Sequence, residues 1–384
     1  MSNAKKINWL NTLFLTINPL VAIVGTIVLA CLHMICWQTV LLTVILAIAG
    51  GISITAGYHR LFSHLSYKAA WPISLFYLLF GAGTFEGSVL EWSTDHRNHH
   101  LYTDTPKDPY SIKGGFWHAH IGWLFTLDPS KRDFSNVTDL QTDPLAQLQH
   151  RFYVPIAIFI GYILPVAIAA LCWNDWIGGL LIAGALRITF SQHTTFFINS
   201  VCHMFGKRPY SDKHTARDNW ITALFTFGEG YHNFHHQFPL EYRNAVRFYQ
   251  YDPTKWFIRT LAFLGLAKDL KTISKQKILK YKINMDTKRL AEEPKAALQA
   301  LHETIMTMLS KADQLETVYR KFKSYNLSDL QIKADEYKAI LKKQHQELKL
   351  LKANLKQLTK EWDQHVKRYL DGFFITDTIQ NTPV

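Results

Sequence analysis

The chain has 384 residues, of which 48% are hydrophobic, and its formal net charge is +12. This length suffices for one large domain or two, and the basic excess does not indicate nucleic-acid binding, because anionic lipid headgroups beside the apolar segments described below account for it. The four cysteines lie in or beside apolar segments without paired spacing, which excludes a disulfide-stapled exported domain and a zinc ribbon.

Four apolar segments are long enough to cross a bilayer, whose hydrocarbon core needs about 20 helical residues. They are residues 12–35, 39–58, 153–173 and 177–198. The first is too long for the apolar part of a signal peptide, and a second span follows it closely. Residues 71–90 are also largely apolar, but Pro72, three glycines and Glu86 predict helices that lie at the membrane interface instead of crossing it.

Eight of the 18 histidines lie in three short motifs, at residues 59–64, 96–100 and 232–236. A single histidine is more often a core or surface residue than a ligand, but chance does not explain this clustering. In the second and third motifs the spacing i, i+3, i+4 places three imidazoles on one face of a helix. His59 and His64 lie about 140° apart around an ideal α-helix, so they reach different metal ions or the helix ends between them. Imidazoles suit Fe, Zn, Cu or Ni, and eight are too many for one ion, so we predict two metal ions.

The three motifs must meet on one side of the membrane to share these ions. Two predicted spans separate the second motif from the third, which satisfies this condition. The short loops at residues 33–38 and 174–175 carry no Lys or Arg, whereas Lys5, Lys6 and the large loops carry most of the positive charge. By the positive-inside rule we expect the histidine face, both termini and the large loops to be cytoplasmic.

A histidine-rich centre of two metal ions at the mouth of an apolar bundle favours iron that activates oxygen to attack a C–H bond of a lipid chain. Zinc-dependent hydrolysis is the alternative chemistry. It usually needs only three protein ligands, an open position and a nearby carboxylate base, so the number of histidines disfavours it.

Five stretches carry a resemblance to a known family. They are ITAGYHRLFSH (residues 54–64), EWSTDHRNHH (91–100), DPYSIKGGFWHAHIGW (108–123), NSVCHMFG (199–206) and GEGYHNFHHQFP (228–239). In combination they resemble the membrane fatty acyl desaturases of the stearoyl-CoA desaturase type, over about residues 10–285. Ring-hydroxylating and alkane-oxidising membrane enzymes share histidine motifs but resemble this spacing less well.

The resemblance implies that nine histidines hold two iron ions, which zinc can replace in a preparation. They are His59, His64, His96, His99, His100, His203, His232, His235 and His236. It also places Asn199 near a metal-bound water. The implied reaction uses O2 and two electrons to remove hydrogen from adjacent methylenes of a saturated acyl chain and leaves a cis double bond, commonly at Δ9. The sequence contains no His-Pro-Gly-Gly motif and no Rossmann or flavin fingerprint, so we expect a separate protein to donate the electrons.

The same resemblance suggests weaker assignments around the centre. For the substrate tunnel these are Trp92, Thr195 and Phe196, with Ala47 and Gly51 at its far end, although small residues in a membrane helix also mark close packing. Asp95 and Glu229 are candidates to orient the imidazoles of metal ligands. The alternative is that both lie on solvated helix surfaces without such a role. Arg187, a charge inside the fourth span, is an anchor or a functional residue.

The chain departs from animal relatives at positions that resemble contacts to CoA, namely Gly87, Thr94 and Leu127-Asp128. Nearby Lys113, Lys131 and Arg132 are candidates to replace the phosphate contacts. Acyl-CoA is the first choice of substrate, and an acyl chain on a lipid or a carrier protein is the second.

Beyond about residue 286 apolar residues recur at steps of three and four on either side of a break at residues 324–329, which predicts two long helices in an antiparallel hairpin. Three roles are open for this hairpin: it covers the cytosolic face, it self-associates, or it docks the electron donor. We favour the first.

The predicted fold is therefore all-α. It comprises a four-span membrane bundle with a cytosolic dimetal cap (residues 1–285), the C-terminal hairpin (286–372) and a tail (373–384). The predicted activity is oxygen-dependent Δ9 desaturation of a long-chain saturated acyl-CoA. Desaturation of acyl-lipid or acyl-carrier protein, fatty acyl hydroxylation and, as a minority alternative, a non-catalytic membrane scaffold remain open.

Overall fold

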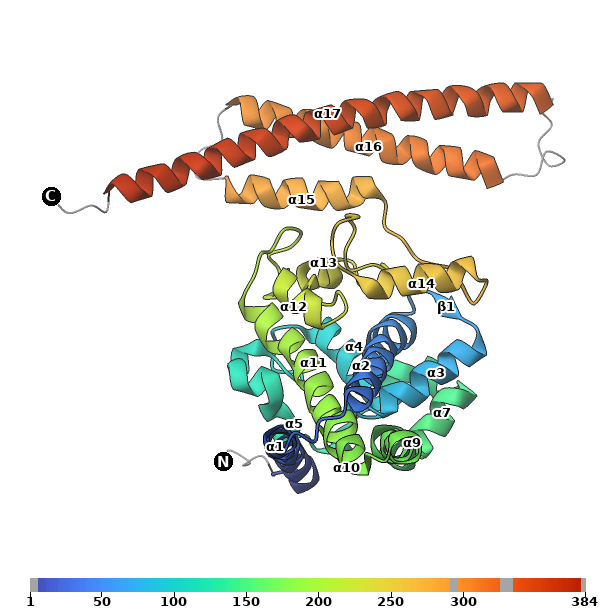
Figure 1. Cartoon of the computed structure of the whole chain (residues 1–384). Coiled ribbons are helices and arrows are strands. Elements are labelled where there is room, and N and C mark those ends of the chain that lie inside the picture. Colours follow the sequence, from blue (N-terminus) through green and yellow to red (C-terminus); the bar gives the residue numbers. More distant parts are fainter. Residues whose placement is uncertain (1–5, 291–295, 325–333, 381–384) are drawn as a thin grey trace. The chain divides into compact units, whose positions relative to one another are not determined.

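The computed structural model describes residues 6–290, 296–324 and 334–380, and these are mostly helical. The chain divides into two compact units, which Figure 1 labels by element. One unit comprises Met1–Arg208 and Asp212–Thr272, and the other comprises Pro209–Ser211 and Ile273–Val384. The all-α expectation is confirmed, with one two-residue pair of strands as the exception among the described residues.

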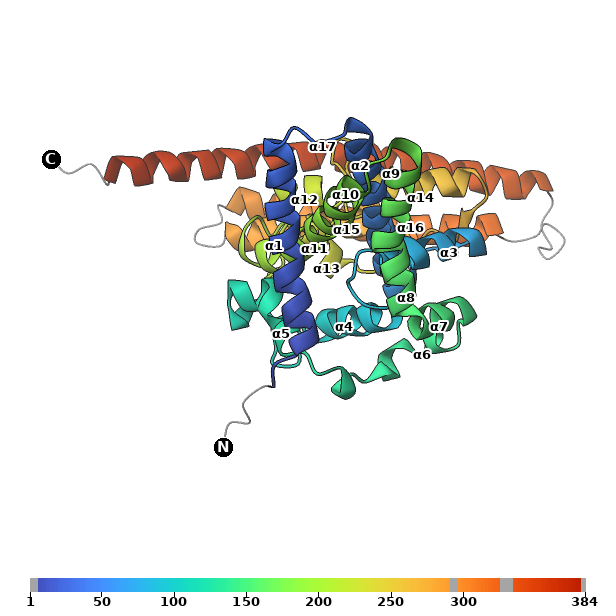
Figure 2. The same ribbon diagram turned by 60° about the horizontal axis from the view of Figure 1, so that its bottom comes forward.

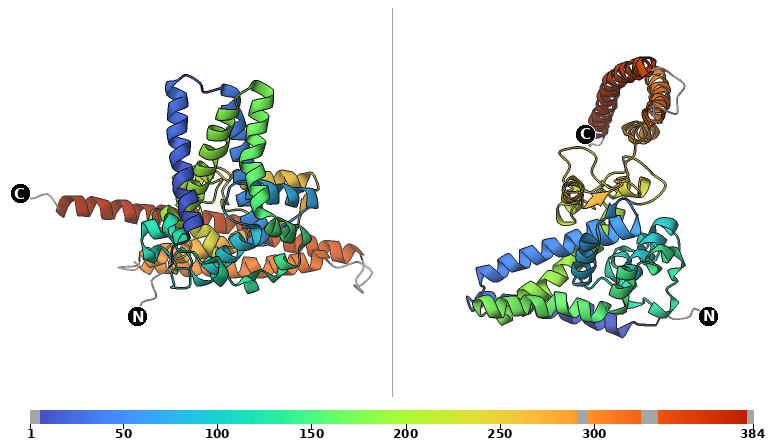
Figure 3. Two further views of the ribbon diagram at one scale, coloured as in Figure 1. Left: turned by 90° about the horizontal axis from the view of Figure 1, so that it is seen from below. Right: turned by 90° about the vertical axis from the view of Figure 1, so that its right-hand side faces the viewer.

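Three helices of the first unit have the length and apolar composition to cross a membrane. They are α1 (Trp9–Cys31), α2 (Trp37–Ile52) with its π-helical continuation η1 (Ser53–Ser63), and the helix formed by α8 (Tyr153–Ile158), η6 (Phe159–Ile163) and α9 (Leu164–Trp173). Their outer faces expose large apolar side chains such as Leu20 and Leu171, as lipid contact requires. Figure 3 (left) shows these helices standing side by side with α11 (Arg187–Met204).

The fourth predicted span, residues 177–198, lies within a continuous helical segment formed by α10 (Trp176–Gly178), η7 (Gly179–Leu186) and α11. This segment packs against α1, α2 and α9, but Arg187, Gln192 and His193 make it less apolar than the other three. Arg187 is buried, and its guanidinium donates hydrogen bonds to the carbonyl oxygens of Ala183 (2.7 Å) and Gly161 (3.1 Å). The four-span count stays a prediction.

Short helices build a cap on the side of the bundle where α1 begins and α11 ends (Figure 2). The helix α3 (Trp71–Ala82) is too short to cross a membrane, and α4 (Val89–Tyr102) begins at a capping box in which Ser88 and Glu91 exchange hydrogen bonds with each other's backbone. Strand β1 (Lys68–Ala69) pairs antiparallel with β2 (Ala267–Lys268).

The remaining short elements of the cap follow in chain order. They are η2 (Ile112–Gly114), η3 (His118–Gly122), α5 (Trp123–Phe125), η4 (Pro129–Lys131), η5 (Phe134–Val137), α6 (Thr138–Gln141), α7 (Pro144–Arg151), α12 (Trp220–Phe225), α13 (His232–Gln237) and α14 (Pro253–Phe263).

The second unit consists of α15 (Lys275–Arg289), α16 (Ala296–Ser324) and α17 (Ala334–Gln380). Its apolar core contains Ile283, Ile305, Leu309, Leu355 and Trp362. The rings of His302 and Trp362 lie 6.0 Å apart and those of Tyr319 and His345 lie 5.6 Å apart, so α16 and α17 run antiparallel along each other, as Figure 2 also shows.

The predicted turn between these two helices lies mostly in residues 325–333, outside the described residues, so a closed hairpin stays a prediction. The main segment of this unit starts at Ile273, because α15 contributes Ile283 to its core, and α17 extends to Gln380. The domain boundaries at residues 285–286 and 372–373 stay predictions, and residues 381–384 lie outside the described residues.

Candidate metal centre

Four elements of the first unit contribute the histidines of the centre. His59 and His64 lie at the end of η1, three histidines lie on α4, His203 lies near the end of α11, and three more lie on α13. In η1 the backbone follows i→i+5 hydrogen bonds, including one from His64 N to His59 O at 3.0 Å, which brings residues five apart onto one face. Of the two alternatives predicted for this pair, different ions or a helix that ends between the two residues, the second is the one observed: η1 ends at Ser63, and the ring centroids of His59 and His64 lie 4.8 Å apart in the same group.

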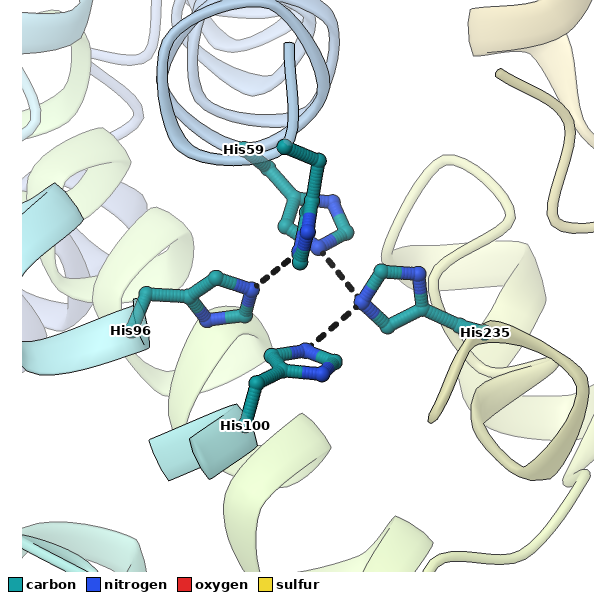
Figure 4. A group of neighbouring side chains, drawn as sticks. His59, His96, His100 and His235 are labelled. Carbon is teal, nitrogen blue, oxygen red and sulfur yellow. Dashed lines mark hydrogen bonds between the residues drawn. The ribbon is translucent and has the colours of Figure 1, made fainter. Parts of the chain in front are cut away.

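The nine histidines gather in two groups, in each of which one nitrogen of every imidazole lies within 4.8 Å of all the others. The first group is His59, His64, His96, His100 and His235, and the second is His99, His203, His232 and His236. Figure 4 labels four members of the first group, which point toward one another from η1, α4 and α13. The motifs on α4 and α13 each contribute to both groups, whereas His59 and His64 both belong to the first.

The spacing of these nitrogens fits metal coordination. Facing Nε2 atoms are 2.8 Å apart for His64 and His96, 2.9 Å for His59 and His235, and 3.1 Å for His203 and His232. With a metal–nitrogen bond of about 2.1 Å, ligands at about 90° have nitrogens about 3.0 Å apart, and tetrahedral ligands about 3.4 Å apart. These three distances are close to the value for ligands at about 90°, and all the facing nitrogens of each group lie within 4.8 Å of one another, so the spacing suits coordination of a metal ion.

Burial favours the neutral form of seven of these imidazoles, as metal ligation requires, by lowering their pKa. Desolvation lowers the pKa of His96, His100, His235 and His236 well below the usual value, and the neighbouring imidazoles lower it further. The nitrogens are thus available as lone-pair donors near neutral pH.

Outer partners hold three of the imidazoles. The Nδ1 atom of His59 lies 2.9 Å from Glu229 Oε2, and the same carboxylate accepts a hydrogen bond from Arg60 Nη2 at 2.8 Å. Burial alone would raise the pKa of Glu229, but Arg60 and His59 lower it overall. His99 Nδ1 lies 2.9 Å from Asp108 Oδ1, and His203 Nδ1 lies 2.8 Å from the hydroxyl of Thr215.

Asp108 and Thr215 were not among the sequence-based candidates. Asp108 follows the second histidine motif and lies in a stretch that carries the family resemblance. This position in the sequence is the signal that could have identified it. Asp95, which the sequence did suggest, forms its hydrogen bonds with Arg132, at 3.2 and 2.7 Å, and not with an imidazole. Its proximity in sequence to His96 therefore did not reveal its partner, which is supplied by a distant segment of the chain.

A cavity of about 590 Å³ opens onto the histidines. It is lined by His59, His96, His99 and His232 and by all the residues proposed for the tunnel and the bound water, which are Ala47, Gly51, Trp92, Thr195, Phe196 and Asn199. Val44 and Ile48 of α2 add apolar wall. Gly51 also permits close packing, because a Cβ atom there would lie 2.2 Å from Phe227 Cε2. Mostly apolar walls with polar groups at one place suit a long acyl chain.

The remaining candidates lie away from the histidines. Arg132 lines the cavity, but Glu91 and Asp95 neutralise it, with Glu91 Oε1 at 2.8 Å from Nη1. Lys113 is exposed, and Lys131 is exposed beside Asp128. Arg187 contacts backbone carbonyls between helices, which is the role of an anchor.

Comparison with known proteins agrees with this arrangement. The profile of the fatty acid desaturase family matches residues 35–265. Acyl-CoA desaturase 1 of Saccharomyces cerevisiae is 44% identical over 289 residues, which are 74% of this chain and 56% of that protein. The probable acyl-CoA desaturase of Schizosaccharomyces pombe is 44% identical over 277 residues, which are 72% of this chain and 57% of that protein.

A stearoyl-CoA desaturase of Sus scrofa is 33% identical over 276 residues, which are 71% of this chain and 76% of that protein. The chain thus spans a little more than half the length of the two fungal relatives and about three quarters of the porcine one. Both the profile match and the identity to these relatives lead to one conclusion: this chain belongs to the fatty acid desaturase family.

Proposed function

We propose that this chain introduces a cis double bond, at Δ9, into a saturated long-chain acyl-CoA, using O2, two iron ions held by the nine histidines and electrons from a separate protein. The observation that carries the proposal is the opening of the apolar cavity onto both histidine groups. The relatives named acyl-CoA and stearoyl-CoA desaturases support the reaction and the carrier.

The iron ions, when bound, would supply the oxidising power needed to remove hydrogen from an unactivated methylene. The protein's own residues hold and enclose the chain. Trp92, Thr195 and Phe196 would fix the acyl chain where it passes the histidines, and the apolar wall from α2 would exclude water from the rest of it. Asn199, at the same cavity, is the proposed partner of a metal-bound water.

The proposed contacts to the CoA phosphates rest on Lys113 and Lys131, which are both exposed. Arg132 is better suited to position the cavity wall, because two carboxylates already neutralise it. A test of substrates on different carriers would distinguish acyl-CoA from the two alternatives, acyl-lipid and acyl-carrier protein.

We further propose that residues 177–198 form the fourth span and that both termini and the metal centre face the cytoplasm. The three candidate membrane helices and the absence of Lys and Arg from the loops at residues 33–38 and 174–175 support this orientation.

The test expresses the chain in a host that lacks its own desaturase and determines the fatty acids and their double-bond positions by mass spectrometry. We expect a monounsaturated acid with the intact chain and with His345→Ala, which changes an exposed histidine of α17, but none with His235→Ala. Hydroxylated acids in place of unsaturated ones would establish the hydroxylase instead. No new acid, even with a supplied electron donor and iron, would refute the proposal.

A further inference from the structure

The turn that follows α4 holds one histidine of the second group directly and reaches a second through another loop. Asp108 Oδ1 lies 2.9 Å from His99 Nδ1, and Asp108 Oδ2 accepts a hydrogen bond from the backbone N–H of Asp104 at 3.1 Å. The side chain of Asp104 leaves this turn toward the loop between α11 and α12. The second histidine, His203, lies beyond that loop.

Asp104 and Thr215 form a two-point contact between these segments. Oδ1 of Asp104 accepts a hydrogen bond from the Thr215 hydroxyl at 2.7 Å, and Oδ2 accepts one from the Thr215 backbone N–H, also at 2.7 Å. The Thr215 hydroxyl lies in turn 2.8 Å from His203 Nδ1. The chain of contacts runs from one carboxylate through one hydroxyl to one imidazole.

The directions of these hydrogen bonds fix the tautomer of His203. A hydroxyl has a single hydrogen, and that of Thr215 is donated to a carboxylate oxygen, which can only accept. Toward His203 the hydroxyl is therefore the acceptor, so His203 carries its proton on Nδ1. The lone pair is left on Nε2, the atom that faces His232 Nε2 at 3.1 Å.

The backbone of Asp104 is unusual for a residue in this position. Its φ is +64°, in the left-handed region that Asp and Asn tolerate better than other residues with a Cβ atom. This conformation allows the backbone N–H to bind Asp108 while the side chain binds Thr215. One residue thus ties together the supports of His99 and His203, which come from different helices.

We propose that Thr215 and Asp104 are positioning residues that set the tautomer and orientation of His203 and thereby determine how tightly the second histidine group binds its metal ion. This inference rests on the proposed function, because it takes the histidine groups to be metal sites. Outer hydrogen-bond partners of this kind typically contribute about 10- to 100-fold to metal affinity.

The test loads the metal-free full-length chain with Fe2+ alone under anaerobic conditions, dialyses it against graded chelator and counts the bound iron by mass spectrometry. Thr215→Val removes the hydroxyl but keeps the shape, and Thr215→Ser restores the hydroxyl. Thr142→Val makes the same change at an exposed residue directly after α6. We expect two ions per chain for the wild type, Thr215→Ser and Thr142→Val. For Thr215→Val we expect one ion to be retained normally and the other to be lost at about 10- to 100-fold lower chelator strength.

Asp104→Asn supplies an independent variant, since asparagine also tolerates the left-handed backbone. It is expected to weaken the binding of the same single ion. If thermal melting of the metal-free protein shows that Thr215→Val does not fold, Asp104→Asn decides the question. Two equally tight ions in both folded variants would overturn the inference while leaving the desaturase proposal intact. Fewer than two ions in the wild type would instead refute the two-ion centre and, with it, the proposed function.

Discussion

Glu86 Oε1 accepts a hydrogen bond from Thr195 Oγ1 at 3.1 Å, and this contact ties the loop before α4 to α11 at the wall of the cavity. The other oxygen of Glu86 lies 3.4 Å from Trp92 Nε1. Burial raises the pKa of Glu86 to about 8, although the hydrogen bonds of Thr195 and Trp92 lower it in part. The side chain is therefore neutral at pH 7, where a long apolar substrate would lie beside it.

Glu86→Gln should change how stability and activity depend on pH. The folded-state pKa of about 8 lies above the ordinary value of 4.5, so between these values the folded chain keeps a proton that the unfolded chain loses. The free energy of unfolding of the wild type should then fall with rising pH in that window, by at most about 1.4 kcal/mol per pH unit, and glutamine should remove this contribution. Above pH 8 the wild type should also lose desaturation, because a charge appears at the cavity wall, while Glu86→Gln should retain it.

Thermal melting and product formation between pH 6 and about pH 9 measure both effects. Glu303→Gln, on an exposed part of α16, is the control and should follow the wild type. Identical pH profiles for Glu86→Gln and the wild type would show that Glu86 is ionised at neutral pH.

Glu229→Gln should weaken both the fold and the first histidine group. The carboxylate accepts two hydrogen bonds from the buried guanidinium of Arg60 and lies beside His59 Nδ1. Loss of its charge should lower the free energy of unfolding by about 1.5–3 kcal/mol. It should also lower the affinity for one metal ion by about 10- to 100-fold.

Denaturant unfolding and metal content together separate these effects. The control is Glu241→Gln, which removes another buried carboxylate, one that forms an ion pair with Arg243. It should reduce stability but leave the metal content unchanged. A normal metal content in Glu229→Gln would mean that His59 does not need this partner.

Ala47→Phe should shift the products toward shorter acyl chains. Ala47 lines the cavity from α2, so a phenyl ring there would occupy space that the far end of the substrate needs. The control, Ile45→Phe, introduces the same side chain. Because Ile45 is exposed on the outer face of the same helix, this variant should leave the product lengths unchanged. Competition between saturated acyl-CoA substrates of different lengths, read by mass spectrometry, tests this. An unchanged chain-length preference in Ala47→Phe would place the end of the substrate elsewhere.

Trp362→Ala should destabilise the second unit alone. Trp362 is 1% exposed in a core with Ile305 and Leu355, and its truncation should cost about 3–5 kcal/mol. Limited proteolysis should then cleave α16 and α17 faster, while the metal content and the product of the first unit remain normal. A parallel loss of metal would show that the two units depend on each other for stability.

Much of the site was determined by local sequence. A spacing of i, i+3, i+4 fixes which imidazoles share a helix face, so His96, His99 and His100 could be predicted to belong to one centre, but the structure divides them between its two groups. Long apolar runs likewise predicted α1, α2 and the helix ending at Trp173, because hydrophobic length is a local property. His203, the one member of the two groups on α11, carried no spacing signal and was found only through the family resemblance.

Only the tertiary structure decided how these local elements combine. The π-helical backbone of η1 brings His59 and His64 into one group, and residue spacing does not reveal it, because the same spacing on an α-helix separates the two rings. Asp104 and Thr215 lie far apart in the sequence, and Asp95 turned out to bind Arg132 and not an imidazole. Helix periodicity reports which face a residue is on, whereas the identity of its partner depends on which distant segment packs against that face.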